Sequence, residues 1–337
     1  SGTTGYPKGA LVTHGMIFWN AINIGHAVGL TSDSTKLNVL PTFHTGGLNL
    51  YTTPCLHLGA RSINLREMDP ARLLHWLTSG EVTHFFGVPA VYQFLAEHPD
   101  WEDADLSPVQ SWACGGAPMP VALLERYAAR GVVIRQGMGL TETSPTVFLT
   151  DEAHALSKAG SVGKPALHTE IRVVDEEGTD VGVDEIGELW VRGPNVTPGY
   201  WERPVANRDS FTDGWLHTGD AARVDADGYV FIVDRWKDMF ISGGENVYPA
   251  EVEQVLFHHP NVKDVAVIGV PDERWGEVGM AVVVPRDPNS FEAADLLGFC
   301  DGKLARYKIP KHARVVDALP RNAAGKVLKR ELRETLS

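Results

Sequence analysis

Apolar runs rich in β-branched residues alternate with helical patterns through the first half of the chain, and this alternation is typical of an α/β protein. The clearest helix covers residues 71–79, because Asp69 offers an N-cap, Pro70 suits the first turn and Gly80 stops the pattern. The same reasoning predicts a buried strand at 82–88, a helix at 120–130 that Gly131 closes, and a strand at 132–134.

From residue 170 onward the pattern changes to short strands separated by turns such as Asp227-Gly228, which indicates antiparallel β structure. Beyond Asp234 helices and strands mix compactly. We therefore expect a large α/β domain over residues 1–234, with a β-rich subdomain at about 170–234, and a small α+β domain over residues 235–337. The predicted strands are 171–174, 188–192, 229–233, 265–270, 280–284 and 313–316, and the predicted helices are 250–258 and 291–299.

Composition narrows the functional classes. The chain carries 30 Lys and Arg against 43 Asp and Glu, a net charge of −13, whereas proteins that bind nucleic acid through its phosphates are normally basic. No apolar stretch approaches the roughly 20 residues of a membrane-spanning helix. Cys55, Cys114 and Cys300 are widely spaced and odd in number, so we predict three buried thiols in a reducing, cytoplasmic setting.

Residues 1–9 combine glycines, hydroxyls and one lysine, Lys8, in a short segment. Glycines let backbone N–H groups approach a polyphosphate and a lysine adds positive charge, so this segment is a candidate phosphate loop. It is not a Walker A loop, because no Gly-Lys-Ser/Thr follows at the required spacing. The alternative is an ordinary flexible Gly/Thr-rich turn.

Two glycine-rich loops, at 115–118 and 137–143, each follow a predicted strand. In α/β sheets the loops after strands gather at the carboxyl edge, where ligands bind. Glu142 would offer Mg²⁺ a carboxylate oxygen, and His44, between an aromatic residue and two glycines, would line a site. The alternatives are tight turns capped by polar residues and a structural histidine.

Two further groups complete the set of candidates. Asp220 and the pair Asp234-Arg235 would supply an acceptor and a donor to sugar hydroxyls, although Asp/Arg pairs are usually surface ion pairs of small energetic weight. Lys326 follows a glycine-containing loop near the C-terminus. A lysine in a tail is normally a solvated charge, so by itself it indicates no catalytic role.

Taken together and in order, these segments resemble the adenylate-forming superfamily, which comprises acyl-CoA synthetases, adenylation domains of peptide synthetases, and luciferases. The resemblance spans the whole chain collinearly, whereas the first part of the family's large domain is absent. The segments are SGTTGYPKGA (1–10), LPTFHTGG (40–47), GGAPMP (115–120), QGMGLTETSP (136–145), GELWVRGP (187–194), WLHTGD (215–220), DRWKDMFISGGENVYPAEVE (234–253) and LPRNAAGKVLKREL (319–332).

The resemblance implies a two-step reaction that uses ATP, Mg²⁺ and CoA. A carboxylate attacks the α-phosphate of ATP, giving an acyl-adenylate and pyrophosphate, and the thiol of CoA then displaces AMP. Because the first step joins two anions, cations and N–H donors must offset their repulsion. Lys326 would bridge the α-phosphate and the attacking carboxylate, Thr141 would contact the α-phosphate, and Glu142 would bind Mg²⁺. The remaining implied nucleotide residues are Ser1, Gly2, Thr3, Thr4, Gly5 and Lys8 for the β- and γ-phosphates, Gly115, Gly116, Ala117, Met138 and Gly139 around adenine, and Asp220 and Arg235 at ribose.

The resemblance also implies that the small domain is mobile and swings about a hinge at Lys237 between the two half-reactions. In one orientation Lys326 enters the site, and in the other residues 240–245 approach the pantetheine tunnel. The implied CoA residues are Gly243, Gly244, Glu245, Trp275, Tyr307 and Lys311. The last three of these match positions that only some aryl-CoA ligases share.

Departures from the family pattern refine the function. Met138 stands where many members stack a tyrosine on adenine, which leaves a softer sulfur contact. Amino-acid-activating members carry an Asp in the segment 43–45, whereas this chain has His44 and no acid there. That difference favours a CoA ligase in which His44 borders the thioester tunnel. The acyl pocket would comprise His44, Phe85, Phe86, Val88, Gly115 and Gly139, which suits an apolar acid, fatty or aromatic.

We therefore expect an ATP-dependent acid–CoA ligase that acts in the cytoplasm and could form a homodimer. The alternatives are a paralogue that binds a nucleotide or acyl-adenylate without turnover, and a luciferase-like oxygenation of the adenylate. Acetylation of Lys326 would remove its charge and control the first step. Since Ser1 lies inside the phosphate loop, we interpret the chain as part of a longer polypeptide and expect residues 1–337 alone to be inactive or poorly folded.

Overall fold

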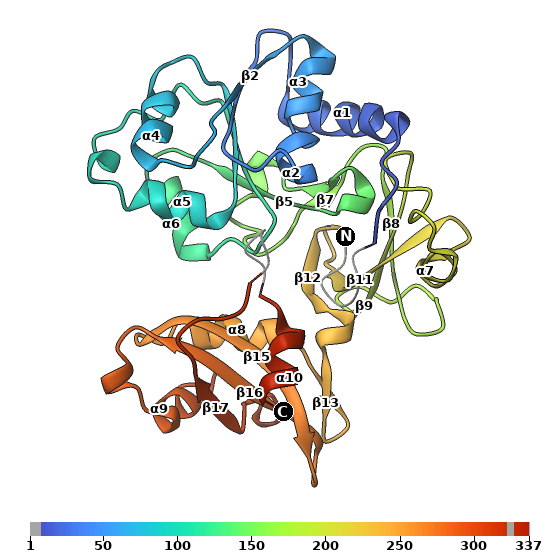
Figure 1. The fold of residues 1–337 in the computed structure, drawn as a ribbon, viewed down its shortest axis with the longest axis vertical. Coiled ribbons are helices and arrows are strands. Elements are labelled where there is room, and N and C mark those ends of the chain that lie inside the picture. The colour runs from blue at the N-terminus through green and yellow to red at the C-terminus, as the bar shows by residue number, and fades with distance from the viewer. Residues whose placement is uncertain (1–7, 322–326, 337) are drawn as a thin grey trace.

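The computed structural model describes residues 8–321 and 327–336. Three sheets follow one another along the chain (Figure 1). The first is seven-stranded, with order β2-β1-β3-β4-β5-β6-β7, and β1 to β5 pair in parallel whereas β6 and β7 pair antiparallel. Its strands are β1 (Thr35–Asn38), β2 (Arg61–Asn64), β3 (His84–Gly87), β4 (Ser111–Cys114), β5 (Ile134–Gly139), β6 (Thr146–Leu149) and β7 (Lys164–Pro165).

Helices cover both faces of this sheet. On one face, side chains of α4, α5 and α6 form a core with Leu37, Phe85 and Trp112. On the other face, α1 and α3 pack over a smaller cluster that Phe86 adjoins. Two layers of helices around a mostly parallel sheet are the α/β architecture that the alternating pattern predicts. The helices are α1 (His14–Val28), α2 (Thr45–Leu48), α3 (Thr52–Leu58), α4 (Pro70–Thr78), α5 (Pro89–Ala96) and α6 (Val121–Ala128).

Local signals locate α4 well. The Asp69 side chain accepts a hydrogen bond from the backbone N–H of Arg72 at 3.1 Å, and Pro70 occupies the first turn, as predicted. The strand expected at 132–134 begins only at Ile134, because the N–H of Val132 bonds to the carbonyl of Tyr127 and still closes α6.

The second sheet confirms the predicted antiparallel β structure. Its order is β10-β11-β9-β8, with β12 paired to β11, and every pairing is antiparallel. It packs against Val147 and Phe148 of β6 through a shared apolar core. The elements are β8 (Glu170–Val174), β9 (Gly187–Arg192), α7 (Pro204–Ser210), β10 (Phe211–Thr212), β11 (Trp215–Val224) and β12 (Val230–Arg235).

The small C-terminal domain is built on the third sheet, of order β14-β13-β16-β15 with β17 paired to β16. α8 and α9 cover one face, and Leu332 of α10 belongs to the core on the other. The strands predicted at 265–270 and 280–284 are the middle of one long hairpin. The elements are β13 (Phe240–Ser242), β14 (Glu245–Val247), α8 (Pro249–Phe257), β15 (Val262–Asp272), β16 (Gly276–Pro285), α9 (Ala293–Gly298), β17 (His312–Val315) and α10 (Lys329–Leu336).

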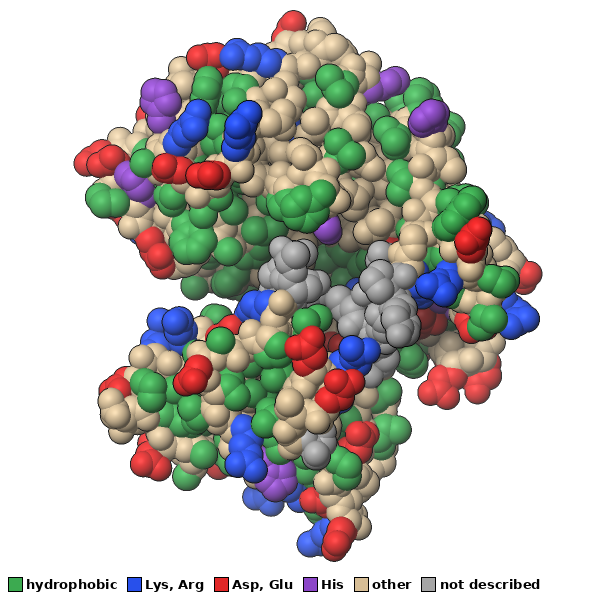
Figure 2. Space-filling view, in the orientation of Figure 1, with side chains coloured by type: hydrophobic (Ala, Val, Ile, Leu, Met, Phe, Trp, Pro, Cys, Tyr) green, Lys and Arg blue, Asp and Glu red, His purple; other side chains and the backbone are tan. Residues whose placement is uncertain are grey.

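Surface and core agree with the composition. Cys55, Cys114 and Cys300 are buried and unpaired, as predicted. Figure 2 shows acidic and basic side chains interspersed on the face in view rather than gathered into one basic area. Within residues 8–321 and 327–336, no helix is long and apolar enough to cross a bilayer.

Candidate nucleotide and acyl site

The loops that follow β4 and β5 lie side by side, because Cys114 and Gln136 are partners across these strands. The two backbones approach closely just beyond this pair. A Cβ atom on Gly115 would lie 2.9 Å from the carbonyl oxygen of Gly137 and 3.1 Å from the ring of Phe86. Glycine is therefore required sterically at this point, and the two predicted loops meet at the carboxyl edge of the sheet.

The second loop is equally tight. A Cβ atom on Gly139 would lie 2.0 Å from the carbonyl oxygen of Pro145, closer than any side chain tolerates. Gly116 and Ala117 are exposed on the neighbouring loop, and Gly116 has a φ of +81°. Met138 is half-buried against the apolar core of the second sheet. Of the candidate adenine residues, Gly116, Ala117 and Gly139 are thus exposed, whereas Gly115 is buried.

Glu142 and Lys8 are joined through a tyrosine. Tyr200 donates its hydroxyl hydrogen bond to Oε1 of Glu142 at 2.8 Å, and the Lys8 ammonium lies 4.3 Å from the centre of the Tyr200 ring. Tyr200 and Glu142 are buried, and burial together with the adjacent carboxylate raises the pKa of Tyr200, so it remains a hydrogen-bond donor. Sequence reasoning missed Tyr200. The Gly-Tyr at 199–200, just past the GELWVRGP segment, was the available signal.

Asp220 and Arg235 are cross-strand partners on β11 and β12. The Nε atom of Arg235 lies 2.9 Å from Oδ1 of Asp220, and the same guanidinium donates to the carbonyl of Thr218 at 3.3 Å. Asp220 is almost fully buried whereas Arg235 is partly exposed. The two candidate ribose residues therefore stand together, and the arginine orients the carboxylate.

His44 starts a short helix, α2. Its Nδ1 accepts a hydrogen bond from the N–H of Gly46 at 3.0 Å, so the ring presents its other nitrogen outward. The side chain is exposed. A Cβ atom on Gly47 would lie 2.2 Å from the carbonyl oxygen of Pro41, so this turn needs a glycine to fold back on the preceding loop.

A buried lysine supports the same turn. Lys36 donates to Oγ1 of Thr52 at 2.8 Å, and Thr52 in turn donates to the carbonyl of Gly47 at 2.8 Å. Lys36 is 1% exposed, and burial lowers its pKa from 10.5 to about 7. Sequence reasoning missed Lys36, because a lysine in a short strand is expected on the exposed face.

The two neighbouring phenylalanines of β3 point to opposite faces of the sheet. Phe85 is fully buried between Tyr92 and Trp112, with ring centres 5.7 and 5.6 Å away. Phe86 points instead toward Gly115 and Tyr51, whose ring centre lies 6.0 Å away. The structure therefore corrects the assignment of Phe85, which belongs to the helix-covered core, because successive side chains of a strand alternate between faces.

Val88 stands beside the remaining acyl candidates. It is the N-cap residue of α5, and a Cβ atom on Gly116 would lie 3.5 Å from its side chain. Val88, Phe86 and Gly115 thus lie on neighbouring strand ends.

The candidate CoA residues gather on the C-terminal domain. A Cβ atom on Gly243 would lie 2.7 Å from the Trp275 ring, and the Lys311 ammonium lies 4.8 Å from the centre of that ring. Trp275 and Tyr307 are each more than a third exposed, and Gly244 and Glu245 are exposed beside them. Figure 1 shows β13 and its turn extending away from the seven-stranded sheet. The structure therefore does not bring this group to the nucleotide candidates.

The remaining candidates lie in short 3-10 helices or outside the described residues. Lys237 belongs to the 3-10 helix Trp236–Asp238 between β12 and β13. Thr141 is half-buried in the 3-10 helix Thr141–Thr143 beside Glu142. Lys326 and the segment from Ser1 to Gly5 lie outside the described residues.

Metal ligands are sparse around Glu142. Among residues 8–321 and 327–336, no three His, Cys, Asp or Glu side chains form a group that would hold a metal ion. A single carboxylate fits Mg²⁺ only where substrate oxygens and water complete the coordination, which is how this ion is commonly held beside phosphates.

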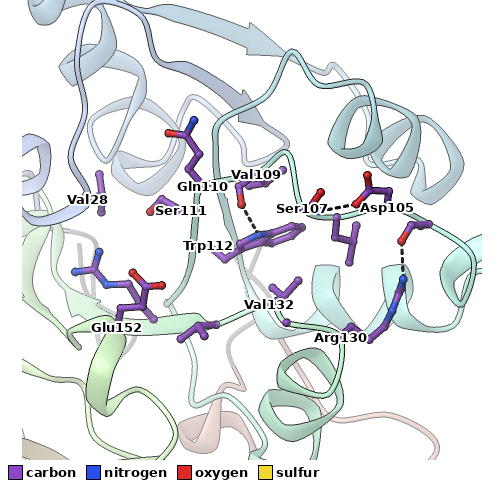
Figure 3. Close-up of a pocket in the computed structure, with 15 residues that line it drawn as sticks. Val28, Asp105, Ser107, Val109, Gln110, Ser111, Trp112, Arg130, Val132 and Glu152 are labelled. Carbon is purple, nitrogen blue, oxygen red and sulfur yellow. Dashed lines mark hydrogen bonds between the residues drawn. The ribbon is translucent and has the colours of Figure 1, made fainter.

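A cavity of about 430 Å³ lies elsewhere (Figure 3). Ser111, Trp112 and Val132 line it at the amino ends of β4 and β5, where Trp112 donates to the carbonyl of Val109 at 3.1 Å. Ligand sites of such sheets lie at the opposite, carboxyl ends, so this cavity is separate from the candidate site.

Comparison with known proteins identifies two family models along the chain. The model of the AMP-binding enzyme matches residues 1–201, and that of the AMP-binding enzyme C-terminal domain matches residues 251–326. A feruloyl-CoA synthase from Amycolatopsis is 47% identical over 99% of this chain and 68% of its own length. An indoleacetate–CoA ligase from Aromatoleum aromaticum is 42% identical over 100% of this chain and 66% of its own length.

A solved structure shares the fold. The o-succinylbenzoate coenzyme A synthetase of Bacillus subtilis, in complex with ATP and a magnesium ion, is 36% identical and superposes with a TM-score of 0.92. The match covers 98% of this chain and 68% of that one. The chain thus spans about two thirds of the length of these similar proteins.

The buried lysine makes stability depend on pH. In the folded state Lys36 loses its proton near pH 7, whereas in the unfolded chain it keeps the proton until about pH 10.5. The unfolded state binds more protons in this window, so stability rises with pH across it. We expect wild type to gain about 2 kcal/mol in free energy of unfolding relative to Lys36→Met between pH 7 and 9. Urea denaturation at pH 7, 8 and 9 measures this gain.

Lys263→Met is the matched control, because Lys263 is exposed on β15. Its stability should run parallel to that of wild type over the same pH range. Parallel curves for Lys36→Met as well would show that Lys36 keeps its proton when buried.

Proposed function

This chain belongs to the AMP-binding enzyme family, and we propose that it activates an aromatic carboxylic acid with ATP and joins it to CoA. The observation that carries the proposal is the contact chain from Lys8 through Tyr200 to Glu142. These contacts link the Lys8 ammonium, through Tyr200, to the carboxylate that would bind Mg²⁺. A site that binds a polyphosphate with its metal ion needs this pair of charges.

In the first half-reaction an oxygen of the acid's carboxylate bonds to the α-phosphorus of ATP, and the bond to the pyrophosphate oxygen breaks. Lys8 and the loop before it hold the β- and γ-phosphates, Thr141 contacts the α-phosphate, and Lys326 offsets the charge of the attacking carboxylate. Mg²⁺ held by Glu142 supplies further positive charge at the phosphates. The hydrogen bond from the Tyr200 hydroxyl fixes the orientation of the Glu142 carboxylate.

The nucleoside binds where the sheets meet. The adenine ring lies along Gly115, Gly116, Ala117, Met138 and Gly139. Asp220 accepts hydrogen bonds from the ribose hydroxyls, and Arg235, paired with it at 2.9 Å, keeps its carboxylate oriented and adds a donor. The buried position of Asp220 supports this role, because a buried carboxylate has to be hydrogen-bonded.

In the second half-reaction the sulfur of CoA attacks the acyl carbonyl and AMP leaves. The Trp275 ring offers a flat surface for the CoA adenine, and Lys311 beside it offers positive charge to a CoA phosphate. Gly243, Gly244 and Glu245 line the pantetheine path, and Tyr307 lies at its outer end. His44 borders the tunnel from the large domain, with one nitrogen fixed by Gly46.

Domain rotation links the two half-reactions. Figure 1 shows β13 and the turn after it, which carries Gly243 and Gly244, extending away from the seven-stranded sheet, so a hinge movement at Lys237 must bring these residues to the nucleotide site. The domain boundary at residues 234–235, a homodimer and a cytoplasmic location stay predictions from the sequence.

The substrate is a short, flat acid. Behind Gly115 the rings of Phe86 and Tyr51 meet edge to face, and Tyr51 is fully buried. Such an aromatic wall closes the inner end of a pocket and presents ring edges to a bound ring. The feruloyl-CoA synthase and indoleacetate–CoA ligase among the similar proteins act on acids of this shape.

An acid panel on the intact polypeptide tests the function. AMP formation would be measured with ATP, Mg²⁺ and each of several arylpropenoic, arylacetic and fatty acids, with and without CoA. We expect turnover that requires CoA and is fastest with the aryl acids. ATP binding by calorimetry without turnover on any acid would indicate a nucleotide sensor instead, and light emission would indicate oxygenation of the adenylate.

Removing the tail ammonium should separate the two half-reactions. Lys326→Ala should lower pyrophosphate release by at least about a hundredfold, because the repulsion between the two anions is no longer offset. Thioester formation from a supplied acyl-adenylate should change little, since the bond to phosphorus already exists. Stopped assays of each half-reaction measure both rates. An equal loss in both would show that Lys326 does not act in the first step alone.

Opening the aromatic wall should change the choice of acid. Phe86→Ala removes one ring behind Gly115, so kcat/KM for aryl acids should fall about tenfold or more while medium-chain fatty acids gain. Phe85→Leu is the matched control, because Phe85 lies on the opposite face in the core. It should lower stability without altering the preference. An unchanged preference in Phe86→Ala would place the acyl pocket elsewhere.

A further inference from the structure

Two ion pairs flank the hinge segment. Before it, Arg235 pairs with Asp220 at 2.9 Å within the second sheet. After it, both terminal nitrogens of Arg333 on α10 lie 3.1 Å from Oδ1 of Asp238. Each pair ties one flank of the hinge to its own domain. Residues 236–237 alone lie between the two tied positions, so a rotation of the domains is confined to a very short stretch of backbone.

Besides the turn bond from the Met239 N–H to the Arg235 carbonyl at 3.3 Å, a side-chain hydrogen bond crosses this stretch. Asp234, the residue before Arg235 on β12, accepts through Oδ2 from the backbone N–H of Ala250 at 2.7 Å. Ala250 lies in the first turn of α8, beyond the hinge. Asp234 is 9% exposed, and its Oδ1 accepts from the N–H of Arg235. A buried carboxylate of the large domain thus holds the start of a helix of the small domain.

The helix depends on this bond at its N-terminus. Its own N-cap residue, Tyr248, makes no side-chain capping bond, and Pro249 has no N–H to donate. The Ala250 N–H is therefore the first free donor of α8, and Asp234 satisfies it from across the hinge. A negative charge at this end is also favourable to the helix dipole. If the C-terminal domain rotated away, α8 would lose both the hydrogen bond to its Ala250 N–H and the negative charge near its N-terminus.

Figure 1 shows β13 and the turn after it, which carries Gly243 and Gly244, extending away from the seven-stranded sheet, and on the proposed function this is the orientation for adenylation. We propose that Asp234 is a positioning residue that holds α8, and with it the C-terminal domain, in the adenylation orientation, and that its bond to Ala250 breaks before CoA can reach the acyl-adenylate. This inference rests on the proposed function. It adds a contact that shifts the equilibrium between the two domain orientations toward adenylation, since a bond made in only one state stabilises that state.

Asp234→Ala tests the inference on the intact polypeptide. Adenylate formation, followed by pyrophosphate release with ATP and an arylpropenoic acid, should fall about tenfold, as expected for a lost hydrogen bond to a charged group. Thioester formation from a supplied acyl-adenylate should be unchanged or faster. Asp234→Asn retains an acceptor oxygen without the charge and should fall between wild type and Asp234→Ala. An equal change in both half-reactions, or no change in either, would overturn the proposal.

Two controls separate a loss of orientation from a damaged site. Asp69→Ala removes a carboxylate that accepts from a backbone N–H at the start of α4, a helix within the large domain. It should lower stability and leave the ratio of the half-reaction rates at the wild-type value. AMP affinity measured by calorimetry should stay unchanged in Asp234→Ala, because both Asp234 oxygens accept from backbone N–H groups and Arg235 keeps its pairing with Asp220. A loss of AMP affinity that accounts for the lower rate would overturn the proposal.

A measurement without turnover distinguishes this inference from the proposed function. Small-angle X-ray scattering of the unliganded protein should match this domain arrangement for wild type and Asp69→Ala, and depart from it for Asp234→Ala. A departure together with inactive wild type would support the contact and refute the ligase. Identical curves for all three proteins would refute the contact, whatever the activity.

Discussion

The close approach of two backbones at the carboxyl edge of the first sheet shapes the site that we propose for the nucleotide. A Cβ atom on Gly115 would crowd the carbonyl of Gly137, and a Cβ atom on Gly139 would clash with the carbonyl of Pro145. Because these positions carry no side chains, the exposed rim beside Gly116 stays open to a flat ring. The charged residues stand around this rim on other elements, Glu142 just after β5 and Asp220 on β11. The close packing of the backbones thus requires glycine at these positions, and the charged residues of the proposed site lie on the elements around them.

Features encoded by adjacent residues could be predicted from the sequence, whereas features that depend on distant partners could not. The Asp69 cap of α4 is local, and the structure has it as expected. Tyr200 was missed because its partner, Glu142, is 58 positions away. Phe85 and Phe86 are the same residue type in adjacent positions, so composition cannot tell which one faces the core. Only the register of β3 in the sheet decides that, and it depends on strands far along the chain.

Charged residues in this protein have two different structural tasks. Asp220 with Arg235, and Asp238 with Arg333, lie inside one domain each and keep the flanks of the hinge fixed. Asp234 lies between them in sequence and instead contacts the other domain. Pairs within a domain are compatible with every orientation, because both partners move together. A contact between domains is compatible with one orientation only, so it alone can influence which orientation the protein prefers.

The strength of such a contact has to be moderate. A hydrogen bond to a charged group contributes about 1.5–3 kcal/mol, which corresponds to roughly a ten- to hundredfold preference. An enzyme with two half-reactions in two orientations has to leave each of them in every turnover. A contact much stronger than this would trap the first orientation and slow the release of AMP, whereas none at all would leave the acid and ATP without a fixed cation during adenylation. One buried carboxylate on one backbone N–H lies between these extremes, and the arrival of CoA can compensate for its loss.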